Sequence, residues 1–294
     1  MHPRELRHFL DLADSLHFGR AAELGHVSPS ALSRSIQRLE EAVGAPLFER
    51  NNRSVSLTHA GRLFLDYARN ASSEWEAIRN RVMAESGALH GEVSMYCSVT
   101  ASYSFLFEIL ARFRQHHPGV EIKLHTGDPE EALARVQGGV EDIAIGARPD
   151  RLPDGLAFRP ITDSPLLFIA GRNPGHDMPA SGVRAQAKDW TGVPMILPER
   201  GLARERADRW FRDLGVLPRI YAQVAGNEAI VSMVSLGFGI GVVPRIVLEN
   251  SPLATTVRVL DARPALAPYE VGLFTQRKRL RSPLIEAFWS LQQD

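Results

Sequence analysis

One predicted helix near the N-terminus groups its polar side chains on a single face whose chemistry suits contact with DNA. This face is formed by Ser30, Ser33, Arg34, Gln37 and Arg38. Leu32, Ile36 and Leu39 recur at helical spacing on the opposite face, where they would pack against the rest of the domain. Hydroxyls, an amide and long cations can reach base edges and phosphates in a major groove. The pattern predicts a DNA-recognition helix, with an ordinary amphipathic helix bearing solvated charges as the alternative.

The residues before this face predict how the helix is held. A preceding helix has small or apolar residues that allow close packing, namely Ala21, Ala22 and Leu24. Gly25 can adopt the positive φ that ends such a helix. Ser28 then offers an N-cap hydroxyl, and Pro29 fits the first helical turn, where no N–H is needed. Residues 18–41 therefore predict a helix-turn-helix, and Ser28 and Pro29 join the predicted DNA-binding residues.

Segments on either side complete a predicted winged domain over residues 1–58. The apolar residues of an amphipathic first helix are Leu6, Phe9, Leu10 and Ala13. Residues 54–57 alternate polar and apolar after a turn, which is typical of a short β-hairpin wing. Arg50 and Arg53 are expected at the wing tip, with only Glu49 as a nearby acid, and would contact phosphates or the minor groove. Solvated loop arginines are the alternative.

A long helix is predicted next, in a linker over residues 59–90 that Thr58 would cap. Its apolar positions recur in steps of four and three at Phe64, Ala68, Ala71, Trp75, Ile78 and Val82. A seam of this period packs against another long helix. We expect a dimer interface, because two wings that contact one dyad-symmetric site need a spacer. Packing on the chain's own next domain is the alternative.

From residue 91 the pattern changes to strands that alternate with helices, which predicts an α/β fold with parallel sheets. Strands are expected at 92–99, 120–126, 142–147, 166–170, 194–197, 220–224, 240–244 and 269–275. Residues 91–294 would form a two-lobed effector-binding domain like that of periplasmic binding proteins. Lobe I would comprise 91–162 and 267–294, and lobe II 163–266. This layout predicts a hinged clamshell with a central cleft.

Ligands of open α/β sheets bind where strands end and helices begin. The predicted effector-binding residues are Ser98, Val99, Thr100, Thr126, Gly127, Gly146, Ala147, Arg200, Gly226 and Asn227. The hydroxyls of Ser98 and Thr100, together with free backbone N–H groups, would suit a carboxylate, and Arg200 is a candidate cation. Helix capping is the alternative for the two hydroxyls, and a surface ion pair is the alternative for Arg200.

Several other kinds of chemistry are excluded or disfavoured. The glycines of 237–241 mimic a dinucleotide loop but follow a helix and precede a strand, which reverses that motif. Ser98 has no nucleophile elbow, and no acid–base set is evident. Adjacent His116 and His117 point apart on a helix, so a metal site is disfavoured. Cys97 is a packed strand residue or, alternatively, a redox sensor. We expect no catalytic centre, metal or cofactor.

The composition is that of an ordinary globular protein with two or three domains. Its 294 residues are 44% hydrophobic, 23% charged and formally neutral overall. Neutrality does not exclude DNA binding, because a local basic face is sufficient. No signal peptide or membrane-spanning run is evident, and the single cysteine excludes an intrachain disulfide. A cytoplasmic protein without membrane contact is therefore expected.

Along essentially its whole length the chain resembles the LysR-type transcriptional regulators. The matching segments are FGRAAELGHVSPSALSRSIQRLEEAVGAPLFER at 18–50, LTHAG at 57–61 and GFGIGVVP at 237–244, together with the two-lobed layout. The resemblance implies a winged helix-turn-helix regulator that binds double-stranded operator DNA as a homodimer or homotetramer and works with RNA polymerase. It also implies that a small metabolite switches the protein. A cytoplasmic solute-binding clamshell or a metabolic enzyme without a DNA role is the alternative.

Within that family, residues 97–128 and 279–289 look like the activator that controls the gene for acetohydroxy-acid isomeroreductase in branched-chain amino-acid synthesis. This closer resemblance implies that the inducer is 2-acetolactate or 2-aceto-2-hydroxybutyrate. Each is an acidic hydroxy-ketone, which fits a pocket of hydroxyls and amides. Two positions depart from the pattern: His59 stands where an acid is usual in the family, and Asn227 where this activator type has His.

Overall fold

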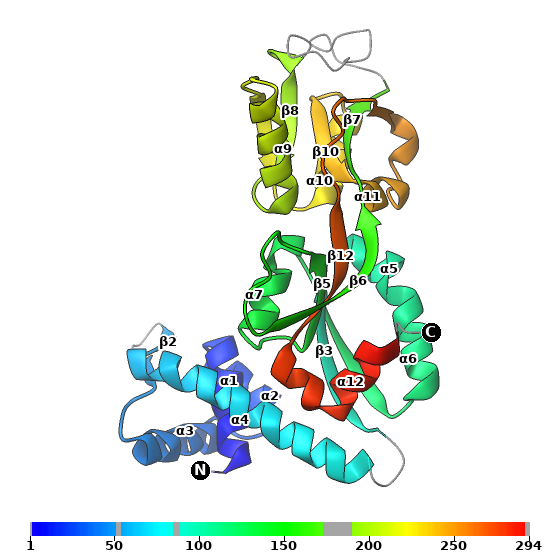
Figure 1. Ribbon diagram of the computed structural model, residues 1–294. Helices are drawn as coiled ribbons and strands as arrows, with labels where there is room; N and C mark the ends of the chain where they lie inside the picture. The colour runs from blue at the N-terminus through cyan, green and yellow to red at the C-terminus, as the bar shows by residue number, and fades with distance from the viewer. Residues whose placement is uncertain (1, 51–53, 85–88, 173–189, 292–294) are drawn as a thin grey trace.

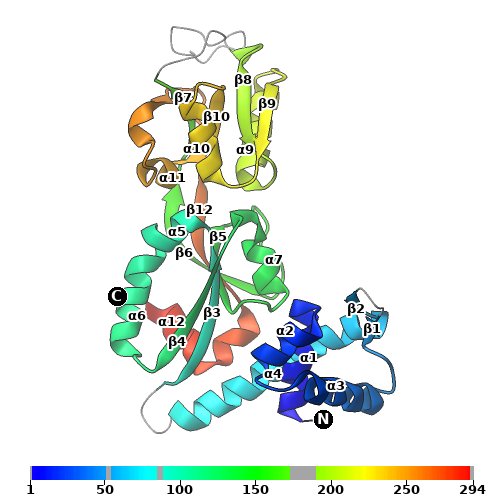
Figure 2. The same cartoon turned by 180° about the vertical axis from the view of Figure 1, so that it is seen from behind.

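The computed structural model describes residues 2–50, 54–84, 89–172 and 190–291. A small N-terminal domain and a long helix lie at one end, and two α/β lobes are stacked beyond them (Figure 1). Turning the molecule by half a turn shows the same order of parts, with the first lobe between the N-terminal domain and the second lobe (Figure 2). Among the described helices, none has the length and apolar character needed to cross a bilayer.

The N-terminal domain is a helix-turn-helix followed by a two-stranded wing. Its elements are α1 (Pro3–Ser15), α2 (Phe18–Leu24), α3 (Pro29–Val43), β1 (Phe48–Arg50) and β2 (Val55–Leu57). The strands pair antiparallel. The core contains Phe9 and Leu12 of α1 and the predicted stripe of α3, Leu32, Ile36 and Leu39, all fully buried. The amphipathic spacing therefore predicted the correct inner face of α3.

Two details of the α2–α3 turn differ from expectation. The positive φ is at His26 (50°), whereas Gly25 has a φ of −79°. Glycine at 25 is favoured by space instead, because a Cβ there would lie 3.2 Å from the His8 ring. Leu24 was expected in the packed face of α2 but is 56% exposed, and the buried residues of this helix are Ala21 and Ala22.

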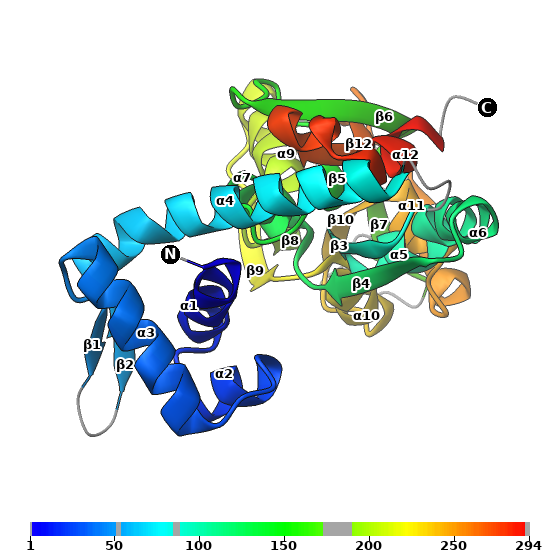
Figure 3. The ribbon, with the colours of Figure 1, turned by 90° about the horizontal axis from the view of Figure 1, so that it is seen from below.

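The long helix α4 (His59–Ala84) leaves the winged domain and reaches α12 (Pro283–Ser290) of the first lobe (Figure 3). The Thr58 hydroxyl accepts a hydrogen bond from the Gly61 N–H at 2.8 Å, as the predicted cap requires. Gly61 lies so close to the wing that a Cβ would approach the Leu47 carbonyl oxygen to 2.0 Å. The start of α4 is thus fixed against the winged domain.

The first lobe is a five-stranded sheet of order β4-β3-β5-β12-β6. Its strands are β3 (Gly91–Cys97), β4 (Val120–Thr126), β5 (Ile143–Ala147), β6 (Leu156–Ser164) and β12 (Tyr269–Gln276). Its helices are α5 (Val99–Ser104), α6 (Leu106–His116), η1 (Pro129–Glu131), α7 (Ala132–Gln137), η3 (Arg277–Arg281) and α12. The last strand, β12, lies between β5 and β6, so the chain returns to this lobe at its end.

The second lobe is a five-stranded sheet of order β11-β7-β10-β8-β9. Its strands are β7 (Leu166–Gly171), β8 (Pro194–Pro198), β9 (Arg219–Val224), β10 (Ile240–Pro244) and β11 (Val257–Leu260). Its helices are α9 (Leu202–Asp213), α10 (Asn227–Ser235), α11 (Arg245–Glu249) and η2 (Ala254–Thr256). The chain crosses between the lobes from β6 to β7 and again from β11 to β12.

The prediction of parallel sheets is wrong for part of each lobe. β12 runs antiparallel to β5 and β6, and β7 runs antiparallel to β10 and β11. Strands β6 and β11 were also missed. β6 contains Pro160, which argues against a strand in a sequence but is tolerated here because β6 is an edge strand.

Candidate DNA-binding surface and effector cleft

The DNA-facing end of α3 is built by its own sequence. The Ser28 hydroxyl accepts a hydrogen bond from the Ala31 N–H at 3.2 Å, and Pro29 occupies the first helical turn. The Ser28 and Ser30 hydroxyl oxygens are 3.1 Å apart. The cap of α3 is therefore made by residues next to it in the sequence.

The polar face of α3 has two constrained side chains and one free cation. Gln37 donates a hydrogen bond to Glu41 at 3.2 Å. Arg38 forms an ion pair with Glu5 at 3.5 Å, but its side chain is 66% exposed, and such pairs contribute little stability. Within the described residues, Arg34 is exposed and makes no hydrogen bond or ion pair. Arg34 therefore presents an uncompensated charge.

Arg50 ends β1 beside the wing turn, as expected, but Glu49 is not its only nearby acid. β1 pairs with β2 so that Arg50 points back over the recognition helix, where its guanidinium contacts Glu40 (3.6 Å) and Ser33 (3.5 Å). The guanidinium carbon also lies 4.7 Å from the centre of the Phe18 ring. Arg50 thus ties the wing to α2 and α3, and its side chain is only 40% exposed. Arg53 lies outside the described residues.

The predicted apolar seam of α4 divides into two parts. Phe64, Ala68 and Ala71 belong to the core of the winged domain, and the Phe64 ring packs edge-on against Phe9 at 4.9 Å. These three residues therefore pack within the chain, on the winged domain. The other three remain exposed: Trp75 by 53%, Ile78 by 56% and Val82 by 66%. The far half of α4 therefore carries an exposed apolar stripe.

A cavity of about 200 Å³ lies between the two lobes, at the ends of strands from both sheets. The predicted residues that line it are Ser98, Thr100, Gly146, Ala147, Arg200, Gly226 and Asn227. The clamshell topology therefore brings together residues that are far apart in the sequence.

Three predicted cleft residues do not line the cavity. Val99 is the first residue of α5 and is 49% exposed. Thr126 pairs with Cys97 in the sheet and its side chain faces solvent. Gly127 lies under the Tyr96 hydroxyl, which a Cβ would approach to 2.4 Å, so this glycine permits packing in the first lobe.

The two predicted hydroxyls have different partners. Ser98 caps α5 by accepting a hydrogen bond from the Ala101 N–H at 3.2 Å. Thr100 is buried, and both its N–H (3.2 Å) and its hydroxyl donate to the carboxylate of Glu228, on the second lobe. Capping therefore accounts for Ser98, whereas Thr100 joins the two lobes.

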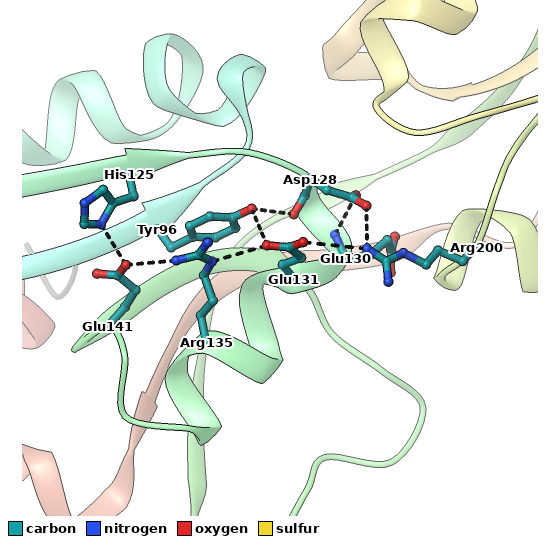
Figure 4. Close-up of polar contacts among 8 residues, drawn as sticks. All are labelled: Tyr96, His125, Asp128, Glu130, Glu131, Arg135, Glu141 and Arg200. Carbon is teal, nitrogen blue, oxygen red and sulfur yellow. Dashed lines mark hydrogen bonds and ion pairs between the residues drawn. The ribbon is translucent and has the colours of Figure 1, made fainter. Parts of the chain in front are cut away.

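Arg200 is held by acids of the first lobe (Figure 4). Its guanidinium lies 3.0 Å from the Asp128 carboxylate and 3.8 Å from that of Glu131. Asp128, as the acceptor of this hydrogen bond, raises the pKa of the guanidinium. The alternative prediction of an ion pair for Arg200 is the one observed, although the pair spans the cleft.

The same close-up shows this cluster continuing through the first lobe (Figure 4). Glu131 accepts from Arg135 at 3.3 Å, and Arg135 lies 3.4 Å from the buried Glu141. Glu141 is also bonded to His125 at 2.7 Å. The Tyr96 hydroxyl donates to the Asp128 carbonyl at 2.9 Å. A connected set of charged and polar groups therefore runs from Asp128 and Arg200 at the cavity into the first lobe.

Glu130 is a cleft residue that the sequence did not reveal. Its carboxyl group lies over Gly201, where a Cβ would be 1.8 Å from the carboxyl carbon. Burial, and next the charge of Asp128, raises the pKa of Glu130 from 4.5 to about 7. Its partners come from a segment 70 residues away, so no local pattern could have identified it. The charged cavity lining described here consists of Arg200 and four acids, Asp128, Glu130, Glu199 and Glu205.

Ser164 is a second residue missed from the sequence. It ends β6 at a crossing between the lobes, lines the cavity and is only 2% exposed. Its hydroxyl has no hydrogen-bond partner in the part of the chain that the structure describes. Buried polar groups are nearly always hydrogen-bonded, so an unpartnered hydroxyl beside a cavity indicates a position for a water molecule or for a polar group of a ligand.

Comparison with known families decides the identity of this fold. The family described as "Bacterial regulatory helix-turn-helix protein, lysR family" matches residues 3–62. The family described as "LysR substrate binding domain" matches residues 86–294. The chain belongs to the LysR family of transcriptional regulators.

Relatives of this LysR-type regulator match it from end to end. The transcriptional regulator IlvY of Escherichia coli (strain K12) is 45% identical over 98% of this chain and 97% of its own length. The transcriptional activator IlvY of Salmonella typhimurium is 44% identical over 98% of each chain. These relatives are transcriptional regulators and not enzymes, so the alternative of a metabolic enzyme or solute-binding clamshell is not supported.

Solved structures share the architecture of this LysR-type regulator. A full-length OxyR variant from Pseudomonas aeruginosa superimposes with a TM-score of 0.73 at 21% identity, covering 100% of this chain and 95% of its own. Full-length CbnR in complex with its target DNA gives 0.64 at 23% identity, covering 99% and 98%. These likenesses establish the fold, including the helix-turn-helix and the two-lobed regulatory domain.

Cys97 and His116 have ordinary structural environments in the described part of the chain. Cys97 is fully buried, and burial raises the pKa of its thiol to about 11, so a reactive thiolate is disfavoured. The His116 ring is bonded to the Arg112 carbonyl at 2.8 Å. Across the described ranges, no group of three or more His, Cys, Asp or Glu side chains is placed to hold a metal ion.

Proposed function

We propose that this LysR-type regulator activates the gene for acetohydroxy-acid isomeroreductase, in branched-chain amino-acid synthesis, when 2-acetolactate or 2-aceto-2-hydroxybutyrate binds in the cleft. The observation that carries the proposal is end-to-end identity of 41–45% with activators and a regulator named IlvY. Identity of this extent spans the DNA-binding domain and both lobes, so it bears on the operator as well as on the inducer.

Operator DNA would be bound through the polar face of α3. Arg34 is exposed and unpaired within the described residues, and the neighbouring hydroxyls of Ser28 and Ser30 lie at the helix start. A free guanidinium can donate two hydrogen bonds to a guanine edge. Arg50 supports this surface by holding the wing against α3 rather than by reaching the phosphates. Because its partner is genomic DNA, we place the protein in the cytoplasm.

The cleft would hold the inducer through hydroxyls and helix N-termini. The cavity volume of about 200 Å³ suits a small metabolite. Leu202 and Asn227 begin α9 and α10 at its edge, and helix N-termini favour a carboxylate. The unpartnered Ser164 hydroxyl would meet the hydroxyl or ketone oxygen of the inducer. Together these groups match the three polar functions of a 2-hydroxy-3-keto acid.

The first lobe would pass the state of the cleft to α4. Lys278 donates a hydrogen bond to Asn70 and Arg279 donates one to Ser73, so η3 is bound to the middle of α4. Arg69 of α4 bonds the Gly138 carbonyl of the first lobe at 2.9 Å and Asp14 of α1 at 3.0 Å. A ligand that prefers one lobe arrangement would therefore reposition the winged domain.

We further propose a homodimer or homotetramer that acts together with RNA polymerase. The exposed stripe of Trp75, Ile78 and Val82 would pack against the same stripe of a second copy. Pairing of α4 helices would place two recognition helices on one dyad-symmetric operator. Contact with RNA polymerase would then convert a ligand-dependent change in DNA binding into activation.

Footprinting of the full-length protein on the promoter of the isomeroreductase gene tests this function. The footprint or the DNA bend is expected to change with 2-acetolactate and not with acetoin, a hydroxy-ketone that lacks the carboxylate. The variant R34A should lose the footprint with and without ligand. Protection and bending that stay the same at saturating 2-acetolactate and 2-aceto-2-hydroxybutyrate would remove the inducer assignment.

A further inference from the structure

Glu130 places a carboxyl group of the first lobe on a helix of the second lobe. It belongs to η1, yet its carboxyl lies against Gly201 at the start of the 12-residue helix α9, where the N–H of Leu202 acts to lower the Glu130 pKa. Gly201, with a φ of 90°, lies directly beneath it, and any Cβ there would overlap the carboxyl carbon. The molecule therefore seats one of its own carboxyls at a helix N-terminus, a site that favours anions.

The groups around the Glu130 carboxyl disfavour its ionised form. Asp128 precedes it in the first lobe, and Glu205 faces it from α9; both carry the same charge. Arg200 is the nearby cation but forms its ion pairs with Asp128 and Glu131. Burial, and next the charge of Glu130, raises the pKa of the nearby Tyr269 of β12, and the charge of Arg206 acts to lower it. Burial and the two acids, Asp128 and Glu205, therefore favour the protonated form of Glu130 in the ligand-free cleft.

The Ser164 hydroxyl is a second indication that this cavity binds a polar ligand. Ser164 is 2% exposed and lines the same cavity, and its hydroxyl has no partner among the described residues. The cavity is thus lined by the Ser164 hydroxyl, which has no partner among the described residues, and by the N-terminus of α9, where the Glu130 carboxyl already lies.

We propose that Glu130 is a built-in competitor for the effector, so that ligand binding exchanges the Glu130 carboxyl for the carboxylate of the ligand at the start of α9. The inference rests on the proposed function, because it requires an anionic ligand in this cleft. In the exchange, the ligand carboxylate accepts the Leu202 N–H, and Glu130 rotates into solvent. Glu130 then no longer links the two lobes, so the exchange also changes how they are joined.

The exchange has a definite proton balance. Burial raises the Glu130 pKa to about 7, so the ligand-free cleft holds about half a proton at pH 7, and an ionised Glu130 in water holds none. Binding of 2-acetolactate therefore releases about half a proton at pH 7 and nearly one at pH 6. Affinity is expected to rise with pH between 6 and 8.

Titration calorimetry of the full-length protein with 2-acetolactate, in two buffers of different ionisation enthalpy, tests the proposal. Glu130→Ala should bind about tenfold more tightly than wild type, as if Glu130 occupied the start of α9 in about nine of ten molecules. E130Q keeps an oxygen that can accept the Leu202 N–H, so its gain in affinity should be smaller. Both should lose the proton release. E205Q removes a carboxylate from the same cavity but leaves Glu130 at the start of α9, so its affinity for 2-acetolactate should change much less.

The possible failures are distinguishable. Weaker binding by both Glu130 variants, proton uptake in wild type, or an equal gain in E205Q would overturn the exchange while leaving the inducer in place. No heat with 2-acetolactate in wild type and in both Glu130 variants would overturn the inducer assignment, and the exchange with it. Far-ultraviolet circular dichroism of each variant confirms that it is folded before titration.

Discussion

The recognition helix and the effector cleft differ in whether their key polar side chains already have partners within the chain. On α3 the cap is local, and Arg34 is exposed without a partner among the described residues. In the cleft, Thr100, Arg200 and Glu130 are all engaged by groups from the opposite lobe. The DNA surface is therefore ready for its partner, whereas a cleft ligand must replace contacts that already exist. This difference would allow the cleft to act as a switch under the proposed function.

The largest effect is expected from R34A. Loss of a bidentate contact to a base costs about 1–3 kcal/mol, so operator affinity should fall by about 5-fold to 150-fold. Fluorescence anisotropy with operator DNA measures this loss, while 2-acetolactate affinity should stay unchanged. Arg38→Ala is the matched control, since Arg38 is already paired with Glu5. Equal losses of operator affinity in R34A and Arg38→Ala would show that the ion pair of Arg38 does not reduce its part in DNA binding.

Ser164→Ala should weaken the ligand and spare the fold. A hydrogen bond that only the ligand supplies contributes about 1 kcal/mol, so 2-acetolactate affinity should fall about fivefold. The free energy of unfolding without ligand should stay the same or rise, because an unpartnered buried hydroxyl is removed. Calorimetry and thermal unfolding measure the two quantities. A less stable protein with unchanged affinity would mean that the hydroxyl serves the fold instead.

Stability without ligand should depend on pH through Glu130. Its pKa is raised from 4.5 to about 7, so the folded protein binds this proton more tightly than the unfolded chain does. The stability that this group contributes is therefore lost as pH rises from about 4.5 to 7. E130Q should melt a few degrees above wild type at pH 8, and the difference should shrink toward pH 5. Parallel melting curves at both pH values would contradict the placement of Glu130.

The smallest effect is expected at Leu24, which is 56% exposed beside the recognition helix. Leu24→Gln should change the free energy of unfolding by less than about 0.5 kcal/mol, because exposed positions contribute little. Ala22, on the packed face of the same helix, is only 2% exposed. Ala22→Gln would put a large side chain into this position and should unfold the winged domain. Denaturant titration of both variants checks which face of α2 is packed.

How much the sequence predicts differs between the same two regions. Caps and apolar stripes act over a few residues, so Ser28, Pro29 and Leu32 could be placed correctly on α3. The direction of Arg50 could not, because it depends on strand pairing and on Glu40. The clamshell layout followed from the order of strands and helices, but the antiparallel strands β7 and β12 did not.

In the cleft, sequence analysis located the strand ends and not the contacts between lobes. Thr100 and Arg200 were correctly expected to line the cavity, yet their partners lie 128 and 72 residues away, at Glu228 and Asp128. Glu130 and Ser164 were missed for the same reason: neither belongs to a local pattern that marks a ligand site. Only the closed fold reveals one as an occupant of the cleft and the other as an unpartnered group.

The most direct test of the account is the concentration of 2-acetolactate that gives half of the change in the DNA footprint, measured for wild type and Glu130→Ala. We predict that the footprint changes in both and that the variant responds at about one tenth of the ligand concentration, because its internal competitor is gone. A footprint that does not respond to ligand in either protein, or a variant that needs more ligand than wild type, would contradict the account.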